Sequence, residues 1–335
     1  VAARAGLDFV LITDHNSGRS GAKVESGVLM ALAEEASTDA GHLLVIGAGD
    51  DWRDRDDPSS GEWANVVAAA RAGGSTGLVR PEGGLVFLAH PEGPNEWRAP
   101  ELREVDGIEV WNADLDWRAG DGFADWAYAL ASLITYPIGA MAHLLDRPDE
   151  GLARLDGLLA DRSVASTCAL DVHQNIEIVE HRKGIPFPTF GQMFAMARQH
   201  VLVGRPRSGD PEEDALALWD ALAAGRSYCA FHVLADGSGL EATAVSGDAR
   251  ASFGGILPFA GEAWLELTLP PAGPLSRTTL YRDGQAVATT EGAQPFFRLD
   301  GPGVYRIEVS LPAPGLRRGR KPWILTNPIY VVPAG

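Results

Sequence analysis

The sequence predicts an α/β domain with a parallel sheet over residues 1–226 and an all-β sandwich domain over residues 227–335. In the first part, apolar strand-like runs alternate with helical patterns, which is typical of a sheet buried on both faces. In the second part, the helical periodicity ends and short strands separated by turns follow one another. The composition supports a globular protein, since 45% of the residues are hydrophobic and 22% are charged.

The strands and helices of the first part are predicted from the period of their apolar residues. The apolar runs predict strands over 8–13, 42–49, 84–90, 107–112 and 163–173. The helical patterns predict helices over 22–37, 65–74, 122–134, 149–162 and 211–225. The last of these helices begins with acidic residues and ends in a glycine, as the helix dipole favours.

Two local patterns carry further expectations. The helix over 22–37 depends on four apolar residues at helical spacing, which are Val24, Val28, Leu29 and Leu32. In the second part, residues 282–284 (Arg-Asp-Gly) predict a hairpin turn between two strands.

Charge and composition limit the classes of partner and location. The net charge of −17 argues against nucleic-acid binding, because phosphate backbones require a basic surface. The sequence has no run of about 18 apolar residues, so it predicts no membrane span. The two cysteines, Cys168 and Cys229, indicate no disulfide framework and do not separate a cytoplasmic from a periplasmic or secreted protein. The chain opens at Val1 with the pattern of a helix end, so we expect upstream sequence, including any signal peptide, to be missing. Localisation and oligomeric state stay unknown.

Carboxylate and imidazole side chains gather at the ends of four predicted strands. They are Asp14 and His15, Asp50 and Asp51, His90, and the pair Asp171 and His173. In a parallel α/β sheet the carboxyl ends of the strands carry the active site. Asp171 and His173 are two residues apart, so both side chains point to the same side of an extended segment. Each group alone is also explained by a polar turn after a strand, but together they predict a metal site.

The donor types indicate the metal and the reaction. Imidazole and carboxylate ligands suit zinc, manganese or iron, and such ions activate a water molecule for hydrolysis. No G-x-S-x-G motif is present, and the glycine-rich segment 47–52 lacks the lysine of a phosphate-binding loop. Arg182 and Lys183 follow the last predicted strand and would contact an anionic substrate, although an ordinary charged loop is the alternative.

Four segments, GLDFVLITDHN, VFLAHPE, GIEVWN and ALDVHQ, resemble in this order the PHP family (polymerase and histidinol phosphatase domains), in particular its carbaryl-hydrolase-like branch. The resemblance covers roughly residues 1–226. It implies a distorted seven-stranded α/β barrel with two or three divalent metal ions. It also implies that His15, His90, Asp171 and His173 are ligands.

The resemblance is incomplete at three positions. The family has a glutamate after its second strand, before an aromatic or small residue, and this place falls here on Asp51 before Trp52. A further family histidine some residues later is replaced by Glu62 or Asn65. The family's first motif, His-x-His on the first strand, is absent, so the barrel is expected to lack its first strand.

These observations predict a metal-dependent hydrolase acting on a small anionic molecule, most simply a phosphoester. The expected metal ligands are His15, Asp51, His90, Asp171 and His173. Asp14, His15 and His173 are the expected catalytic residues, with Asp14 orienting a ligand. His42, His200 and His232 receive no role. The alternatives are a carbamate or amide hydrolase with the same site, and a non-catalytic protein that binds a carbohydrate or another partner.

Overall fold

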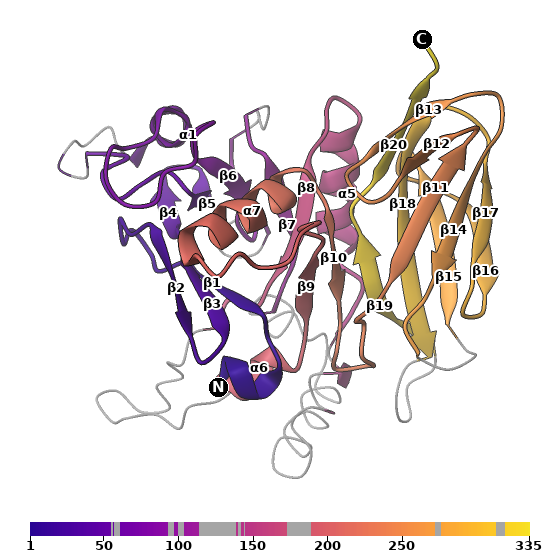
Figure 1. The fold of residues 1–335 in the computed structure, drawn as a ribbon, viewed down its shortest axis with the longest axis horizontal. Helices are drawn as coiled ribbons and strands as arrows, with labels where there is room; N and C mark the ends of the chain where they lie inside the picture. The colour runs from indigo at the N-terminus through magenta and orange to yellow at the C-terminus, as the bar shows by residue number, and fades with distance from the viewer. Residues whose placement is uncertain are drawn as a thin grey trace.

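The computed structural model places an α/β part beside a β-sandwich (Figure 1). It describes residues 1–54, 56, 61–92, 97–99, 104–113, 139, 142–143, 145–172, 189–271, 276–312 and 319–335. In these residues, twenty strands form four sheets and are accompanied by four α-helices. The expected seven-stranded α/β barrel is therefore wrong, because a barrel of that kind would need about seven helices.

The central sheet of the α/β part has five strands in the order β4-β5-β6-β7-β8. Its two pairings on one side, β4 with β5 and β5 with β6, are antiparallel, whereas β6, β7 and β8 run parallel. The expectation of a wholly parallel sheet is therefore wrong, because this sheet is mixed. Its strands are β4 (Glu34–Thr38), β5 (Gly41–Ile46), β6 (Leu85–Leu88), β7 (Gly107–Asn112) and β8 (Ala165–Ala169).

The helix predicted over 22–37 is wrong, because this segment forms strands instead. A three-stranded sheet has the order β1-β3-β2, with β1 parallel and β2 antiparallel to β3. Ser26 and Gly27 are the two residues between β2 and β3, and both have positive φ, 52° and 84°. A two-residue loop of this conformation favours a tight hairpin over a continuing helix. The strands are β1 (Phe9–Ile12), β2 (Gly21–Glu25) and β3 (Val28–Leu32).

Three predicted helices are confirmed, and the one over 122–134 lies outside the described residues. Helices α1 (Trp63–Ala72) and α5 (Asp149–Leu159) pack on one face of the central sheet, and α7 (Pro211–Ala223) packs on the other. The short α6 (Phe190–Phe194) and the 3-10 helix η1 (Ala2–Ala5) lie at the end near the N-terminus (Figure 1). In the described part of the chain, every helix is too short or too polar to cross a membrane.

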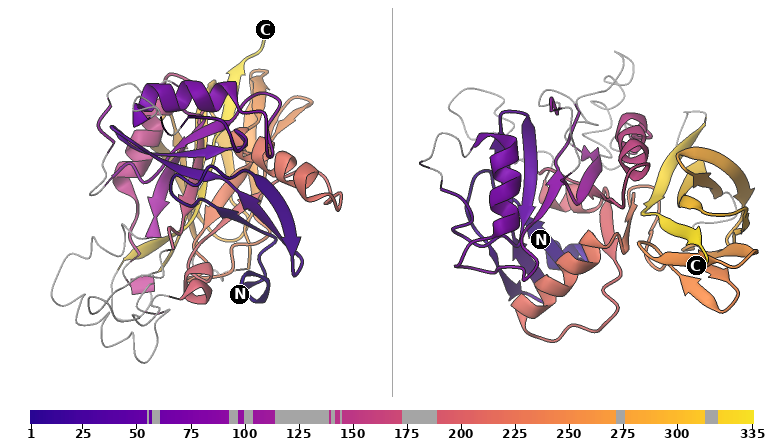
Figure 2. Two further views of the ribbon diagram at one scale, coloured as in Figure 1. Left: turned by 90° about the vertical axis from the view of Figure 1, so that its left-hand side faces the viewer. Right: turned by 90° about the horizontal axis from the view of Figure 1, so that it is seen from above.

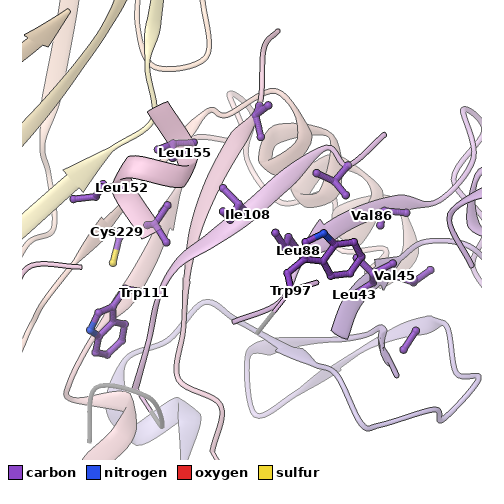
Figure 3. Packing of buried hydrophobic residues seen from close by; sticks show 14 of the residues in the cluster. Leu43, Val45, Val86, Leu88, Trp97, Ile108, Trp111, Leu152, Leu155 and Cys229 are labelled. Atoms are coloured by element: carbon purple, nitrogen blue, oxygen red, sulfur yellow. The ribbon is translucent and has the colours of Figure 1, made fainter. Parts of the chain in front are cut away.

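Alternate residues of the central sheet enter two different cores. Leu43, Val45, Val86 and Leu88 belong to the core that contains the apolar sides of α1 and α5, and Figure 3 shows them with Leu152 and Leu155 of α5. Their neighbours along the strands, Leu44, Ile46, Leu85 and Phe87, belong to the core that contains the apolar side of α7. The alternation follows from the two-residue period of a strand, and it fixes which polar residues share the α7 side of the sheet.

The β-sandwich consists of two sheets that bury a common core (Figure 2). The larger sheet contains the path β13-β20-β18-β19-β10-β9, with β15 and β16 added at β18, and the smaller has the order β12-β11-β14-β17. Antiparallel pairing of β10 with both β9 and β19 continues the larger sheet across residue 226. The strands are β9 (Arg198–Val201), β10 (Ser227–Ala230), β11 (Glu241–Ser246), β12 (Ala249–Ala251), β13 (Ile256–Phe259), β14 (Ala263–Thr268), β15 (Arg277–Arg282), β16 (Gln285–Glu291), β17 (Phe296–Leu299), β18 (Gly303–Pro312), β19 (Arg320–Thr326) and β20 (Ile329–Pro333).

The hairpin predicted at residues 282–284 is confirmed. Asp283 and Gly284 connect β15 to β16, with φ of 49° and 78°. Positive φ at both central residues is the conformation that matches the twist of a two-residue hairpin.

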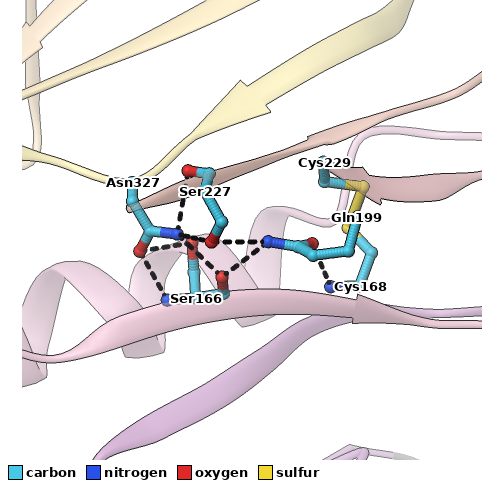
Figure 4. The surroundings of a disulfide bond; sticks show 6 residues. All are labelled: Ser166, Cys168, Gln199, Ser227, Cys229 and Asn327. Atoms are coloured by element: carbon cyan, nitrogen blue, oxygen red, sulfur yellow. Dashed lines mark hydrogen bonds between the residues drawn. A yellow bond between two sulfur atoms is a disulfide. The ribbon is translucent and has the colours of Figure 1, made fainter. Parts of the chain in front are cut away.

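A disulfide and a buried amide join β8 to the sandwich (Figure 4). Cys168 on β8 and Cys229 on β10 form the disulfide, which the cysteine count alone does not indicate. Close by, the Asn327 side chain accepts a hydrogen bond from the Ser166 amide at 2.6 Å and donates to the Ser227 carbonyl at 3.1 Å. These contacts hold β8, the edge strand of the central sheet, against the larger sheet of the sandwich.

Candidate metal centre

The parallel strands β6, β7 and β8 bring three polar residues to one edge of the central sheet. His90 follows β6, Asn112 ends β7 and Asp171 follows β8. Asn112 Nδ2 donates a hydrogen bond to Asp171 Oδ2 at 3.2 Å. For these strands, the expectation that strand ends converge agrees with the arrangement in the structure.

Asp51 requires a correction, because it does not reach this edge. It follows β5, which runs antiparallel to β6, so the end of β5 and the end of β6 lie at opposite edges. The Asp51 carboxylate instead accepts hydrogen bonds from Ser75 and from the Thr76 amide, and these bonds lower its pKa. Asp51 therefore caps the loop at residues 75–76 and stays apart from the ligands expected beside it.

The antiparallel direction of β5 also places its first residues beside the end of β6. His42 lies near the start of β5, and the Ala89 amide donates to its carbonyl at 3.2 Å. In the β4–β5 pairing, Ser37 is opposite His42 and Glu35 is opposite Leu44. Opposite and alternate residues share a face, so Glu35 and His42 both point to the α7 side of the sheet.

Glu35 is the centre of a compact group of side chains. Its Oε1 lies 2.7 Å from His42 Nδ1 and 2.9 Å from His90 Nε2, and these two ring nitrogens are 3.1 Å apart. His15 Nδ1 lies 3.8 Å from the same oxygen. We call His15, Glu35, His42 and His90 the His–Glu cluster.

Backbone pairing explains how His15 joins this cluster. The segment after β3 continues beside the end of β1, since the Ala33 amide donates to the Ile12 carbonyl. A further parallel bridge pairs His15 with Glu35. The His15 side chain is 43% exposed, whereas that of Glu35 is 7% exposed, so His15 forms the open side of the cluster.

Strained backbone conformations coincide with this edge. Among the described residues other than glycine, five have positive φ, and three of these are Asn16 (47°), His90 (24°) and Asp171 (45°). Such conformations cost about 1–3 kcal/mol each and persist where the surrounding structure enforces them. Their position beside the His–Glu cluster is typical of a functional site.

The charges of the cluster depend on each other. Burial by itself would raise the pKa of Glu35, but contacts with His42 and His90 outweigh burial and lower the pKa to about 2. Burial would lower the pKa of His90, but Glu35 and Glu109 outweigh it and raise the pKa to about 9. Glu35 is therefore ionised at neutral pH and its negative charge is directed at the imidazoles.

The donor atoms fit a single transition-metal ion. Ligand atoms about 2 Å from one tetrahedral ion lie roughly 3.3 Å from each other. His15, Glu35 and His42 each offer one ligand atom, and these atoms lie within 4.8 Å of one another. His90 Nε2 lies within 3.1 Å of both the glutamate oxygen and the His42 nitrogen. Nitrogen-rich donor sets with one carboxylate suit zinc, manganese or iron.

A cavity of about 1570 Å³ opens beside β1, and the predicted site residues are distributed around it. Its walls include Asp14, His15, His90 and Asp171, with Asp14 exposed to solvent. The remaining predicted residues, His173, Arg182 and Lys183, lie outside the described residues.

Two members of the cluster, Glu35 and His42, were not expected from the sequence. The predicted helix over 22–37 placed Glu35 inside a helix, so the expected carboxylate ligand fell on Asp51 instead. Glu35 precedes the small residue Ala36, and His42 follows seven positions later, near the start of the next strand. A strand assignment for 28–38 would have identified both.

No protein-family model and no curated protein matches this sequence.

Proposed function

We propose that the chain is a metal-dependent hydrolase of a small molecule, with a phosphoester as the first substrate class. The observation that carries the proposal is the convergence of three imidazoles on one buried carboxylate oxygen, Glu35 Oε1. Glu35, His42 and His90 would hold the ion, and His15 would complete the donor set at the solvent side. A divalent ion bound there would supply Lewis-acid activation of water and of a substrate oxygen.

The surrounding residues support binding and proton transfer in this proposal. Asp14 is an exposed carboxylate next to His15 on the cavity wall, so it is placed to accept a proton from an attacking water. Asn112 orients the Asp171 carboxylate toward the same edge. The motifs that resemble the PHP family support the proposal further. Glu35 can supply the family glutamate that was expected at Asp51, and His42 can supply the family histidine whose place was expected at Glu62 or Asn65.

Metal content tests the donor set directly. We would load the protein with Zn²⁺, Mn²⁺ or Fe²⁺, remove free metal and measure bound metal by mass spectrometry. The proposal predicts at least one tightly bound ion, lost in Glu35→Gln and His42→Gln. Asp51→Asn is the matched control, because its carboxylate is used in a loop cap. Equal metal content in Glu35→Gln and the unaltered protein would contradict the proposed site.

A carbamate or amide hydrolase at the same site is the second candidate function. The cavity wall next to the cluster is apolar and includes Leu11, Ile46 and Phe87, which favours a substrate with an uncharged aromatic or aliphatic portion. Hydrolysis rates of an aryl phosphate and an aryl N-methylcarbamate by the metal-loaded protein separate the two. Faster phosphate release supports the first candidate and faster carbamate cleavage the second. Tight metal binding without either activity supports the non-catalytic alternative.

A further inference from the structure

Glu109 lies beneath the His–Glu cluster and outside the proposed donor set. It belongs to β7 and is 5% exposed, at the deep wall of the cavity. Its Oε2 accepts a hydrogen bond from the His90 backbone amide at 2.8 Å. The same oxygen accepts a second bond from Asn112 Nδ2 at 3.4 Å. Because so little of its surface is exposed, these two hydrogen bonds dominate the surroundings of the Glu109 side chain.

We propose that Glu109 is a positioning residue that sets the direction of His90 and, through Asn112, of Asp171. The effect on metal binding rests on the proposed function, whereas the effect on the His90 conformation does not.

The path of the chain at His90 requires such a support. Phe87 and Ala89 face the α7 side of the sheet, so a regular strand would direct His90 to the opposite face. The φ of 24° at His90 interrupts this alternation and brings its Nε2 to Glu35. This conformation also turns the His90 amide toward Glu109, whose carboxylate satisfies it. This hydrogen bond to the buried Glu109 side chain offsets part of the cost of the strained backbone.

A second connection extends from Glu109 to the next strand end. Asn112 Nδ2 donates to Glu109 Oε2 and also to Asp171 Oδ2 at 3.2 Å. Asp171 is another residue with positive φ, at 45°. One carboxylate oxygen therefore supports both strained residues that follow the parallel strands β6 and β8.

The test compares Glu109→Gln with Glu109→Leu. Gln keeps an oxygen acceptor for the His90 amide, whereas Leu has a similar volume and no acceptor. In protein without added metal, we would record the imidazole ¹⁵N signals of His42 and His90, with His200 and His232 as internal controls. We would then titrate both variants with Co²⁺ and follow the ligand-field absorption.

We expect Glu109→Leu to shift the His42 and His90 signals, leave the His200 and His232 signals in place, and weaken Co²⁺ binding by at least about tenfold. Glu109→Gln should restore the signals and the Co²⁺ spectrum. Unchanged His90 signals in Glu109→Leu would overturn the inference, whatever the Co²⁺ affinity of this variant.

The two proposals fail in different ways. If the unaltered protein binds no Co²⁺ but its His90 signals respond to Glu109→Leu, the metal function is wrong and the positioning role stands. Should Glu109→Leu not fold, as judged by circular dichroism, Glu109→Met provides an unbranched side chain without an acceptor of comparable strength. The His42 and His90 imidazole signals of Glu109→Met then test whether Glu109 positions His90.

Discussion

Two groups of histidines, each with at least one member on the wall of the same cavity, have opposite electrostatic character. His15 and His90 contact Glu35 in the His–Glu cluster. In the second group, His200 also lines the cavity, and its Nε2 lies 2.9 Å from His232 Nε2. Burial and the nearby Arg198 lower the pKa of both His200 and His232 to about 4. The pKa of His90, in contrast, is raised to about 9 by carboxylates that outweigh burial.

The difference shows that one buried carboxylate distinguishes a candidate metal site from a structural histidine pair. His200 and His232 satisfy each other through a single hydrogen bond, and the Tyr228 ring stacks on His200 at 4.7 Å. Asp236 lies 3.6 Å from His232 Nδ1 and is exposed. In the His–Glu cluster, the buried Glu35 provides the negative oxygen on which the imidazoles converge. Four predictions test this contrast.

The largest effect is expected from the disulfide, whose two cysteines are close in sequence to residues that contact the two groups. Cys168 precedes Asp171 on the same strand end, and Cys229 is next to Tyr228. A crosslink over 61 positions stabilises a fold by roughly 4 kcal/mol. Cys168→Ser together with Cys229→Ser should lower the free energy of unfolding by about this amount in urea denaturation. A midpoint equal to that of the unaltered protein would contradict the prediction.

Glu35→Gln should weaken metal binding by roughly 100-fold or more, about 2.7 kcal/mol, because it removes the charge on which the imidazoles converge. Metal affinity is measured by competition with a coloured chelator. His200→Gln is the matched control, and we expect its metal affinity to equal that of the unaltered protein. Loss of metal in the control alone would reverse the roles of the two groups.

The histidine pair should destabilise the fold in acid. The unfolded chain takes up protons on His200 and His232 near pH 6.5, whereas the folded pair does so near pH 4. Between these values the unfolded state binds more protons, so stability is present above pH 6.5 and is lost as the pH falls toward 4. The loss should be a few kcal/mol, because each histidine contributes up to about 1.4 kcal/mol per pH unit between these values. Urea titrations at pH 7 and pH 4.5 measure it, and His200→Gln with His232→Gln should show a smaller difference between the two pH values. The same difference in this variant would assign the acid effect to other groups.

His15→Ala should have the smallest effect, about a tenfold loss of metal affinity or activity. The His15 ring is the most exposed and most distant member of the cluster, at 3.8 Å from Glu35 Oε1. The chelator competition used for Glu35→Gln measures this loss. A loss as large as that of Glu35→Gln would show that His15 is a principal ligand.

Much of the fold follows from local patterns, and the exceptions have a common cause. Helices α1, α5 and α7 and the strands β5 to β8 were predictable from apolar periodicity. The segment 22–37 was not, because its apolar spacing fits a helix and a hairpin equally well and the Ser26–Gly27 loop decides between them. That single error removed β4, and with it Glu35, from the candidate site.

The sequence by itself determined the donor types and the strand ends that carry His15, His90 and Asp171, since these depend on local periodicity. Strand direction was decided only in the tertiary structure. Because β5 runs antiparallel to β6, Asp51 lies at the far edge of the sheet while His42 meets His90. Direction in a sheet depends on pairing between residues distant in the chain, such as Leu43 with Leu88, and no local pattern encodes it.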